Sequence, residues 1–165
     1  MMRFVKNYII NEKFTDESDP IRDMGIGNRA IIEKWIKQFS VGRYHDPFVL
    51  EAKFTINNNL TIDVKGNLNL YNIGLVELPL YIKFRTVKGT MWINSNPLTT
   101  LRGCPEYVTD NFFCCDNQLT SLEYAPKKVD DMFACYNNLV EFTIEDVKKV
   151  CNVKGNDIRV KDPKQ

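Results

Sequence analysis

Apolar residues recur through the last two thirds of the chain at one constant spacing. Columns of apolar residues and one column of asparagine repeat every 21 residues. They are Val87, Val108, Val129 and Val150; Met91, Phe112 and Phe133; Ile93, Cys114 and Cys135; Asn96, Asn117 and Asn138; and Leu98, Leu119 and Val140. A looser copy begins near Val64 at an offset of 23, and a truncated copy runs from Val150 to Ile158. Several columns in one register predict a repeat architecture.

Each unit begins with alternating apolar and polar residues, which is the period of a half-buried strand. One strand per coil would stack into a parallel sheet with rungs about 4.8 Å apart. The asparagine column is best explained by side chains that satisfy buried backbone groups where the chain leaves the strand. Pro105 and Pro126 favour a non-helical return, whereas residues 143–146, Thr-Ile-Glu-Asp, predict a short capped helix.

The unit from Phe112 to Leu119 has the order apolar, any, apolar, two of any kind, Asn, any, apolar. This order resembles the leucine-rich-repeat signature L-x-L-x-x-N-x-L, and the whole unit is similar to the short bacterial and viral variety. The resemblance covers roughly Leu60 to Ile158. Ile73 stands in place of the first asparagine, and cysteines replace two inner leucines. The resemblance implies a short parallel β-solenoid that works by binding another macromolecule.

The N-terminal third predicts a cap for the open first coil, which a solenoid requires. Residues 28–39 have the apolar spacing of an amphipathic helix, with Trp35 and Phe39 expected in the core. Residues 47–62 alternate enough to predict a strand or hairpin. We therefore expect an α+β chain with a cap over residues 1–59 and a solenoid over residues 60–165, forming one compact unit.

The bulk composition limits the classes of function. The 22 Lys and Arg residues nearly balance the 21 Asp and Glu residues, so no global field attracts nucleic acid or an anionic membrane. The apolar runs are far shorter than the roughly 20 residues that span a bilayer, and no signal-peptide core is present. The five cysteines do not form a secreted disulfide framework. We expect a soluble cytoplasmic protein.

The sequence offers little conventional chemistry. Cys114 and Cys135 share an inward column at a distance that a disulfide tolerates, but packing explains them better, and a single histidine excludes the usual zinc patterns. Residues 25–27, Gly-Ile-Gly, are a weak phosphate signal because no longer fingerprint accompanies them. We expect no cofactor, no metal site and no catalytic residue.

The outward side of the predicted strands carries the candidate site. If the Met91 column points inward, the residues beside it form an aromatic stripe on the face that leucine-rich repeats generally use for binding. Aromatic clusters of this kind mark interfaces. The predicted partner-binding residues are Tyr71, Trp92, Asn94, Phe113, Cys115 and Tyr136. The acidic residues expected around them, which favour a basic or mixed protein partner, are Asp110, Asp116, Glu123 and Asp131.

The preferred hypothesis is a protein–protein interaction module without enzymatic activity. Residues 14–27 are similar to a segment near the start of uncharacterised bacteriophage proteins, which leads to a viral protein that binds and inhibits a host protein in the host cytoplasm. Two alternatives stay open. One is a hydrolase or nucleic-acid-modifying enzyme centred on His45 with Asp46 and Glu51. The other is a virion or assembly component, and a homodimer through the aromatic stripe is also open.

Overall fold

A computed structural model describes residues 27–40 and 54–162, with the side chains of the first segment described for residues 29–37. The chain divides into two compact units, residues 1–50 and 51–165, and each is described by itself. The prediction that cap and solenoid form one compact unit stays a prediction.

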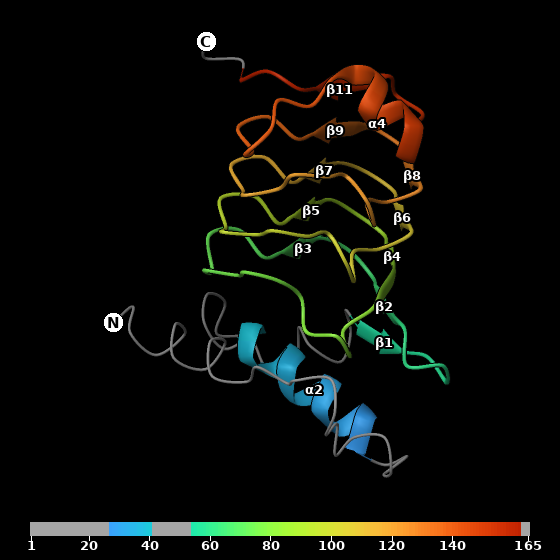
Figure 1. Cartoon of the computed structure of the whole chain (residues 1–165). Helices are drawn as coiled ribbons and strands as arrows, with labels where there is room; N and C mark the ends of the chain where they lie inside the picture. The colour runs from blue at the N-terminus through green and yellow to red at the C-terminus, as the bar shows by residue number, and fades with distance from the viewer. Residues whose placement is uncertain (1–26, 41–53, 163–165) are drawn as a thin grey trace. The chain divides into compact units, whose positions relative to one another are not determined.

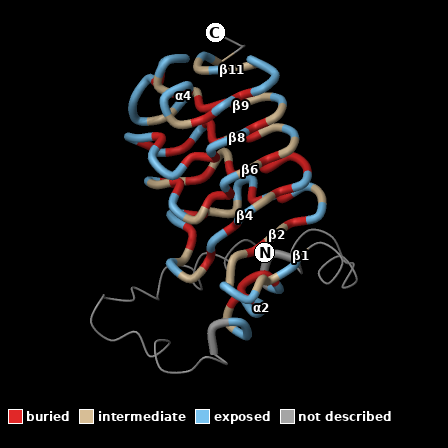
Figure 2. The backbone as a smooth tube through the Cα atoms, turned by 90° about the vertical axis from the view of Figure 1, so that its right-hand side faces the viewer, coloured by how far each residue is buried: buried red, intermediate tan, exposed pale blue. Residues whose placement is uncertain are grey.

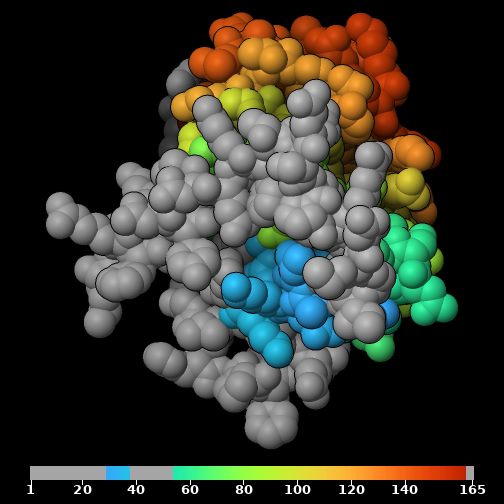
Figure 3. All heavy atoms as spheres, turned by 60° about the horizontal axis from the view of Figure 1, so that its bottom comes forward, coloured from blue at the N-terminus to red at the C-terminus, as the bar shows by residue number. Residues whose placement is uncertain are grey.

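The first unit contains helix α2 (Gly27–Ser40), within one residue of the predicted span at each end. Its side chains alternate between two environments at helical spacing. Ile32, Trp35 and Ile36 are buried, whereas Glu33 and Lys34 between them are exposed. The helix is drawn in blue in Figure 3. The amphipathic prediction and the core assignment of Trp35 are confirmed, and the side chain of Phe39 lies outside the described residues.

The second unit is a parallel β-solenoid built from two sheets (Figure 1). The six-stranded sheet contains, in order, β1 (Phe54–Ile56), β2 (Ile62–Val64), β4 (Phe84–Val87), β6 (Tyr107–Val108), β8 (Lys128–Val129) and β10 (Asn152–Val153). The five-stranded sheet contains β3 (Leu68–Asn69), β5 (Met91–Trp92), β7 (Phe112–Phe113), β9 (Met132–Ala134) and β11 (Asp157–Arg159). Every pairing is parallel except that of β1 with β2, which form a hairpin, one of the two forms predicted for residues 47–62.

Each coil carries two strands rather than the single strand that the alternation predicted. The additional strand arises because the valine column is itself in register: Val87 pairs with Val108, and Val108 with Val129. The 23-residue offset of the first copy is confirmed, because Val64 pairs with Val87. A truncated last copy is present as β10 and β11, but the place of Val150 in the valine column is wrong, since Val129 pairs with Val153. Helix α4 (Ile144–Val150) lengthens the last unit and moves the register.

The core consists of the inward residues of successive coils stacked on one another. Met91 pairs with Phe112, and Phe112 with Phe133, and all three side chains are fully buried. The rings of Phe112 and Phe133 contact each other at a centroid distance of 5.2 Å. Figure 2 shows this buried interior in red along the coils. Burial of large apolar side chains, at about 1.5–3 kcal/mol each, is the main favourable term for such a stack.

The asparagine column lies inside the solenoid, as the sequence predicted. Asn96 and Asn117 are almost fully buried, at 5% and 7% exposed. Each side-chain amide links its own coil to a neighbouring coil, so no amide atom is left unpaired. Asn117 Oδ1 accepts from the N–H groups of Asn96 (3.2 Å) and Leu98 (3.3 Å), and its Nδ2 donates to the carbonyls of Ile93 (3.1 Å), Cys114 (3.0 Å) and Cys115 (3.2 Å).

Helix α4 begins where the sequence placed a capped helix. Thr143 is the N-cap: its Oγ1 accepts from the N–H of Asp146, and the carboxylate of Asp146 accepts from the N–H of Thr143 in return. The hydroxyl of Thr143 also donates to this carboxylate at 2.7 Å, and together with Lys149 and the Thr143 N–H it lowers the pKa of Asp146 to about 2. Val147 is the fully buried residue of the helix.

Replacing Asn117 by Ala should lower the free energy of unfolding by about 3 kcal/mol, because buried N–H and C=O groups of two coils lose their partner. Chemical denaturation monitored by circular dichroism measures this. Asn152→Ala is the matched control, since Asn152 is an exposed asparagine on β10, and we expect a change within about 0.5 kcal/mol. Equal losses for the two variants would contradict a structural role of the column.

Candidate functional site

The parallel register brings the predicted partner-binding residues onto the outward side of the five-stranded sheet. Trp92 lies between Asn69 and Phe113, and Phe113 pairs with Ala134. Two residues further along each strand, the same register produces a second row. We call these two rows the strand face: Asn69, Trp92, Phe113, Ala134 and Arg159, then Tyr71, Asn94, Cys115, Tyr136 and Lys161.

The centre of the strand face is a stacked aromatic pair. The rings of Trp92 and Phe113 lie 6.2 Å apart between centroids with an interplanar angle of 8°. Both side chains are partly exposed. The pairing follows from the fold, because equivalent residues of adjacent coils are held one rung apart. An aromatic pair of this kind is worth about 0.5–1.5 kcal/mol beyond its burial, so the two rings form one pre-ordered apolar surface.

The second row differs from the sequence prediction at one position. Cys115 lies on the strand face in the expected register, but its side chain is buried, at 1% exposed. A hydrogen bond with Cys115 raises the pKa of the neighbouring Tyr136 hydroxyl, and burial adds to this effect. Cys115 therefore positions Tyr136 and offers almost no surface to a partner. Its short side chain lies between longer neighbours, which alternation alone does not reveal.

Tyr71 and Asn94 occupy the near end of the second row. Tyr71 is 40% exposed, and its backbone N–H donates to Asn69 Oδ1 at 2.9 Å. Asn94 is half-buried, and its Nδ2 lies 3.5 Å from Ser95 Oγ. The structure thus places all six predicted residues on one side of one sheet, and it brings Trp92 and Phe113 into direct contact.

Two asparagine side chains on this side of the sheet have unused acceptors. The Oδ1 atoms of Asn94 and Asn111 are buried and accept no hydrogen bond within the described part of the chain. Asn111 lies immediately before Phe112, and its Nδ2 donates to Thr90 Oγ1 at 3.2 Å. A buried acceptor without a partner costs free energy, so both atoms are places where a donor from another molecule would be stabilising. Asn111 was not among the residues predicted from the sequence, although it shares the outward parity of Phe113.

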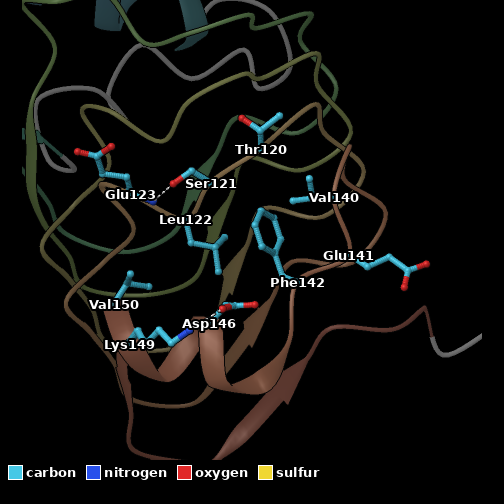
Figure 4. Close-up of a pocket in the computed structure, with 10 residues that line it drawn as sticks. All are labelled: Thr120, Ser121, Leu122, Glu123, Val140, Glu141, Phe142, Asp146, Lys149 and Val150. Carbon is cyan, nitrogen blue, oxygen red and sulfur yellow. Dashed lines mark hydrogen bonds and ion pairs between the residues drawn. The ribbon is translucent and has the colours of Figure 1, made fainter.

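The acidic residues expected around the strand face do not all lie there. Asp110 and Asp131 precede β7 and β9, and Asp116 follows Cys115 and accepts from Asn137 Nδ2 at 2.9 Å. Glu123 lies instead in the return segment. There it lines a shallow open depression of about 520 Å³ together with Ser121, Leu122 and Phe142 (Figure 4).

The depression is shaped by residues that have structural partners. Asp146 caps α4 and forms an ion pair with Lys149 at 3.0 Å, and Ser121 Oγ accepts from the N–H of Glu123. The carboxylate of Asp146 is fully ionised near neutral pH, since its pKa is about 2. These groups hold the turn and the helix in place and do not form a poised acid–base pair.

All five cysteines are free and buried. Burial raises the pKa of each thiol, to about 11 for Cys115 and about 12 for Cys135 and Cys151. Cys114 and Cys135 share the inward column that the sequence predicted, and the packing interpretation is confirmed. Within residues 29–37 and 54–162, no three His, Cys, Asp or Glu side chains are grouped so that they could hold a metal ion.

Several candidates fall outside the described residues. They are His45, Asp46 and Glu51, and residues 25 and 26 of the predicted phosphate cradle, whose third residue, Gly27, begins helix α2. The enzyme alternative stays a prediction. No described helix is long and apolar enough to cross a membrane.

No protein-family model, curated protein or solved structure matches this chain. The assignment to a parallel β-solenoid therefore rests on the chain's own register and hydrogen bonds.

The buried thiols should be unreactive in the folded protein. At pH 8 we expect a disulfide reagent to modify them at least about 100-fold more slowly than ordinary thiols, because raised pKa values reduce the thiolate fraction. The reaction is followed by the thiolate that the reagent releases, with and without guanidinium. In the unfolded protein all five cysteines should react. One thiol that reacts at the unfolded rate in the native protein would identify a site that the fold leaves accessible.

Proposed function

We propose that this chain is a protein-binding module that docks a partner on the strand face. The observation that carries the proposal is the stacked, partly exposed Trp92–Phe113 pair at the centre of that face. Large aromatic side chains in ordered positions are the residues most enriched among energetic hot spots of interfaces. The face also lies on the side of the coil that leucine-rich repeats, which the repeat unit resembles, generally use for binding.

The outward side of the other sheet provides a contrast within the same molecule. Its charged residues form ion pairs with one another: Arg85 with Asp63, Lys127 with Glu106, and Lys128 with Asp130. Lys128 Nζ also lies 4.3 Å from the ring centroid of Tyr107. Polar groups there engage neighbours on the same sheet: even Asp130 Oδ1, a buried atom that accepts no hydrogen bond, lies 3.2 Å from Lys128 Nζ. The strand face instead combines an apolar pair with the unused acceptors of Asn94 and Asn111, which is the composition of an interface centre with specific polar contacts.

The partner that fits this face presents an apolar group flanked by hydrogen-bond donors. Asn94 and Asn111 supply buried acceptors. Negative charge lies nearby at Asp110, Asp116 and Asp131, and positive charge lies at the β11 end of the face, on Arg159 and Lys161. A basic or mixed protein surface matches these features, and opposite charge accelerates its association.

We place this activity in a reducing compartment, the cytoplasm of a host bacterium if the chain is viral. The free state of all five cysteines supports this location. The role proposed for this binding is inhibition of the bound protein. A module that only binds can inhibit a partner by covering part of its surface.

The proposal is tested by affinity capture from bacterial lysate followed by mass spectrometry. The wild type is compared with a Trp92→Ala/Phe113→Ala double variant and with Tyr124→Ala. Tyr124 is the matched control because it is an aromatic residue, 55% exposed, in the return segment. We expect a protein retained by the wild type and by Tyr124→Ala but lost by the double variant. With the purified partner, the double variant should raise Kd by about 30-fold or more.

The folded state of each variant is checked first by circular dichroism and thermal unfolding. If all three proteins retain the same set, or none retains any protein, the strand face is not the binding surface.

A further inference from the structure

The last strand of the five-stranded sheet has one edge that no described strand covers. β11 pairs with β9 and ends the sheet (Figure 1). The carbonyl of Arg159 accepts from the N–H of Cys135, so the backbone groups of Arg159 point toward β9. Since successive residues of a strand point their N–H and C=O groups to opposite sides, those of Ile158 point toward the open edge. An open edge of this kind is a template for another strand.

The core layer beneath this edge is also incompletely covered. The inward column of Leu68, Met91, Phe112 and Phe133 is 0–5% exposed, but Ile158, which pairs with Phe133, is only half-buried. Val160 is half-buried as well, although Cys135 in the preceding coil is buried. A solenoid end that leaves apolar core residues partly exposed is stabilised by whatever stacks on it.

The charged side chains of β11 determine which kind of strand can pair with its open edge. On the outward side, Asp157 and Arg159 flank Ile158 and form an ion pair at 3.0 Å. We propose that β11 pairs antiparallel with β11 of a second copy of this chain, with Ile158 opposite Ile158. In this arrangement Asp157 of each copy lies opposite Arg159 of the other. Two opposite-charge cross-strand pairs form, and each is favourable.

The alternative registers are disfavoured by the same charges. When one copy of β11 slides along the other, the inward and outward sides of the two strands match only if the register shifts by two residues at a time. A shift in one direction places Arg159 opposite Arg159 of the second copy, and a shift in the other direction places Asp157 opposite Asp157. Like charges directly opposite are destabilising, so the register centred on Ile158 is the one in which residues 157–159 meet only opposite charges. The shift that sets Arg159 opposite Arg159 also sets Asp157 opposite Lys161, but it keeps the Arg159–Arg159 contact.

The dimer has a consequence for the strand face. The twofold axis is perpendicular to the sheet at Ile158, so the five-stranded sheets of the two copies become continuous. The outward side remains on the same side in both copies. Two Trp92–Phe113 pairs would then point in one direction, and a partner with two binding sites, or a surface of repeated subunits, would be held by both.

The test uses two charge-reversal variants, each of which should fail to dimerise alone but should dimerise with the other. Asp157→Arg makes strand 157–159 carry two arginines, and Arg159→Asp makes it carry two aspartates. Neither variant can pair with itself without like-charge contacts, but one of each restores both opposite-charge pairs. Both side chains are well exposed, at 39% and 45%, so neither change should disturb the fold.

Sedimentation velocity is measured from about 1 μM to about 1 mM, which covers dissociation constants of small interfaces. We expect the 19.2 kDa wild type to reach a dimer in this range, each single variant to stay monomeric, and their equimolar mixture to dimerise. Circular dichroism of each variant confirms that it is folded. A wild type that stays monomeric throughout, single variants that dimerise as tightly as the wild type, or a mixture that stays monomeric would each overturn the proposal. These outcomes report the oligomeric state and do not involve Trp92 or Phe113, which carry the proposed partner binding, so the two proposals fail independently.

Discussion

The solenoid depends on the hydrogen bonds that three asparagine side chains make across its coils. Each leaves the end of a strand, where backbone groups of two coils are buried without ladder partners, and the amides of Asn96 and Asn117 satisfy several of them at once. Asn138 continues the pattern with the carbonyls of Cys114 and Cys135. Because these bonds hold one coil at a fixed rise from the next, they also fix which side chains become neighbours on the outward side.

The sequence predicts those parts of the fold in which the same physical requirement, such as burial or hydrogen bonding, is met by a characteristic residue type. The asparagine column, the inward column through Phe112 and the capping residues of α4 are of this kind. The sequence fails where units differ in length. Val150 keeps the 21-residue step but ends α4, and the helix shifts the true valine to Val153. Periodicity cannot locate an insertion when a residue of the right type happens to stand at the expected place.

The sequence predicted which side of the sheet the site residues occupy, but not how far each side chain is exposed. Alternation placed Trp92 and Phe113 outward and adjacent, which their stacking confirms. It could not show that Cys115 is buried, because burial depends on the length of neighbouring side chains. The residue type just before each asparagine of the column also marks a feature of the backbone. That residue has a positive φ, as in Ser95 (57°) and Asp116 (54°). Asn, Asp and small polar residues tolerate this backbone better than apolar ones, so they mark where the strand face ends.

The two end coils of the described solenoid differ in how their strand edges are covered. At the start of the six-stranded sheet the edge is closed by β1, which reverses direction and pairs antiparallel with β2. At the other end, helix α4 buries Val147, yet Ile158 and Val160 remain half-buried. The edge strand there carries charges of both signs two residues apart. Such charges discourage pairing with most strands, but they are complementary to their own antiparallel copy. The same residues can therefore protect the edge from general aggregation and select a single partner for it.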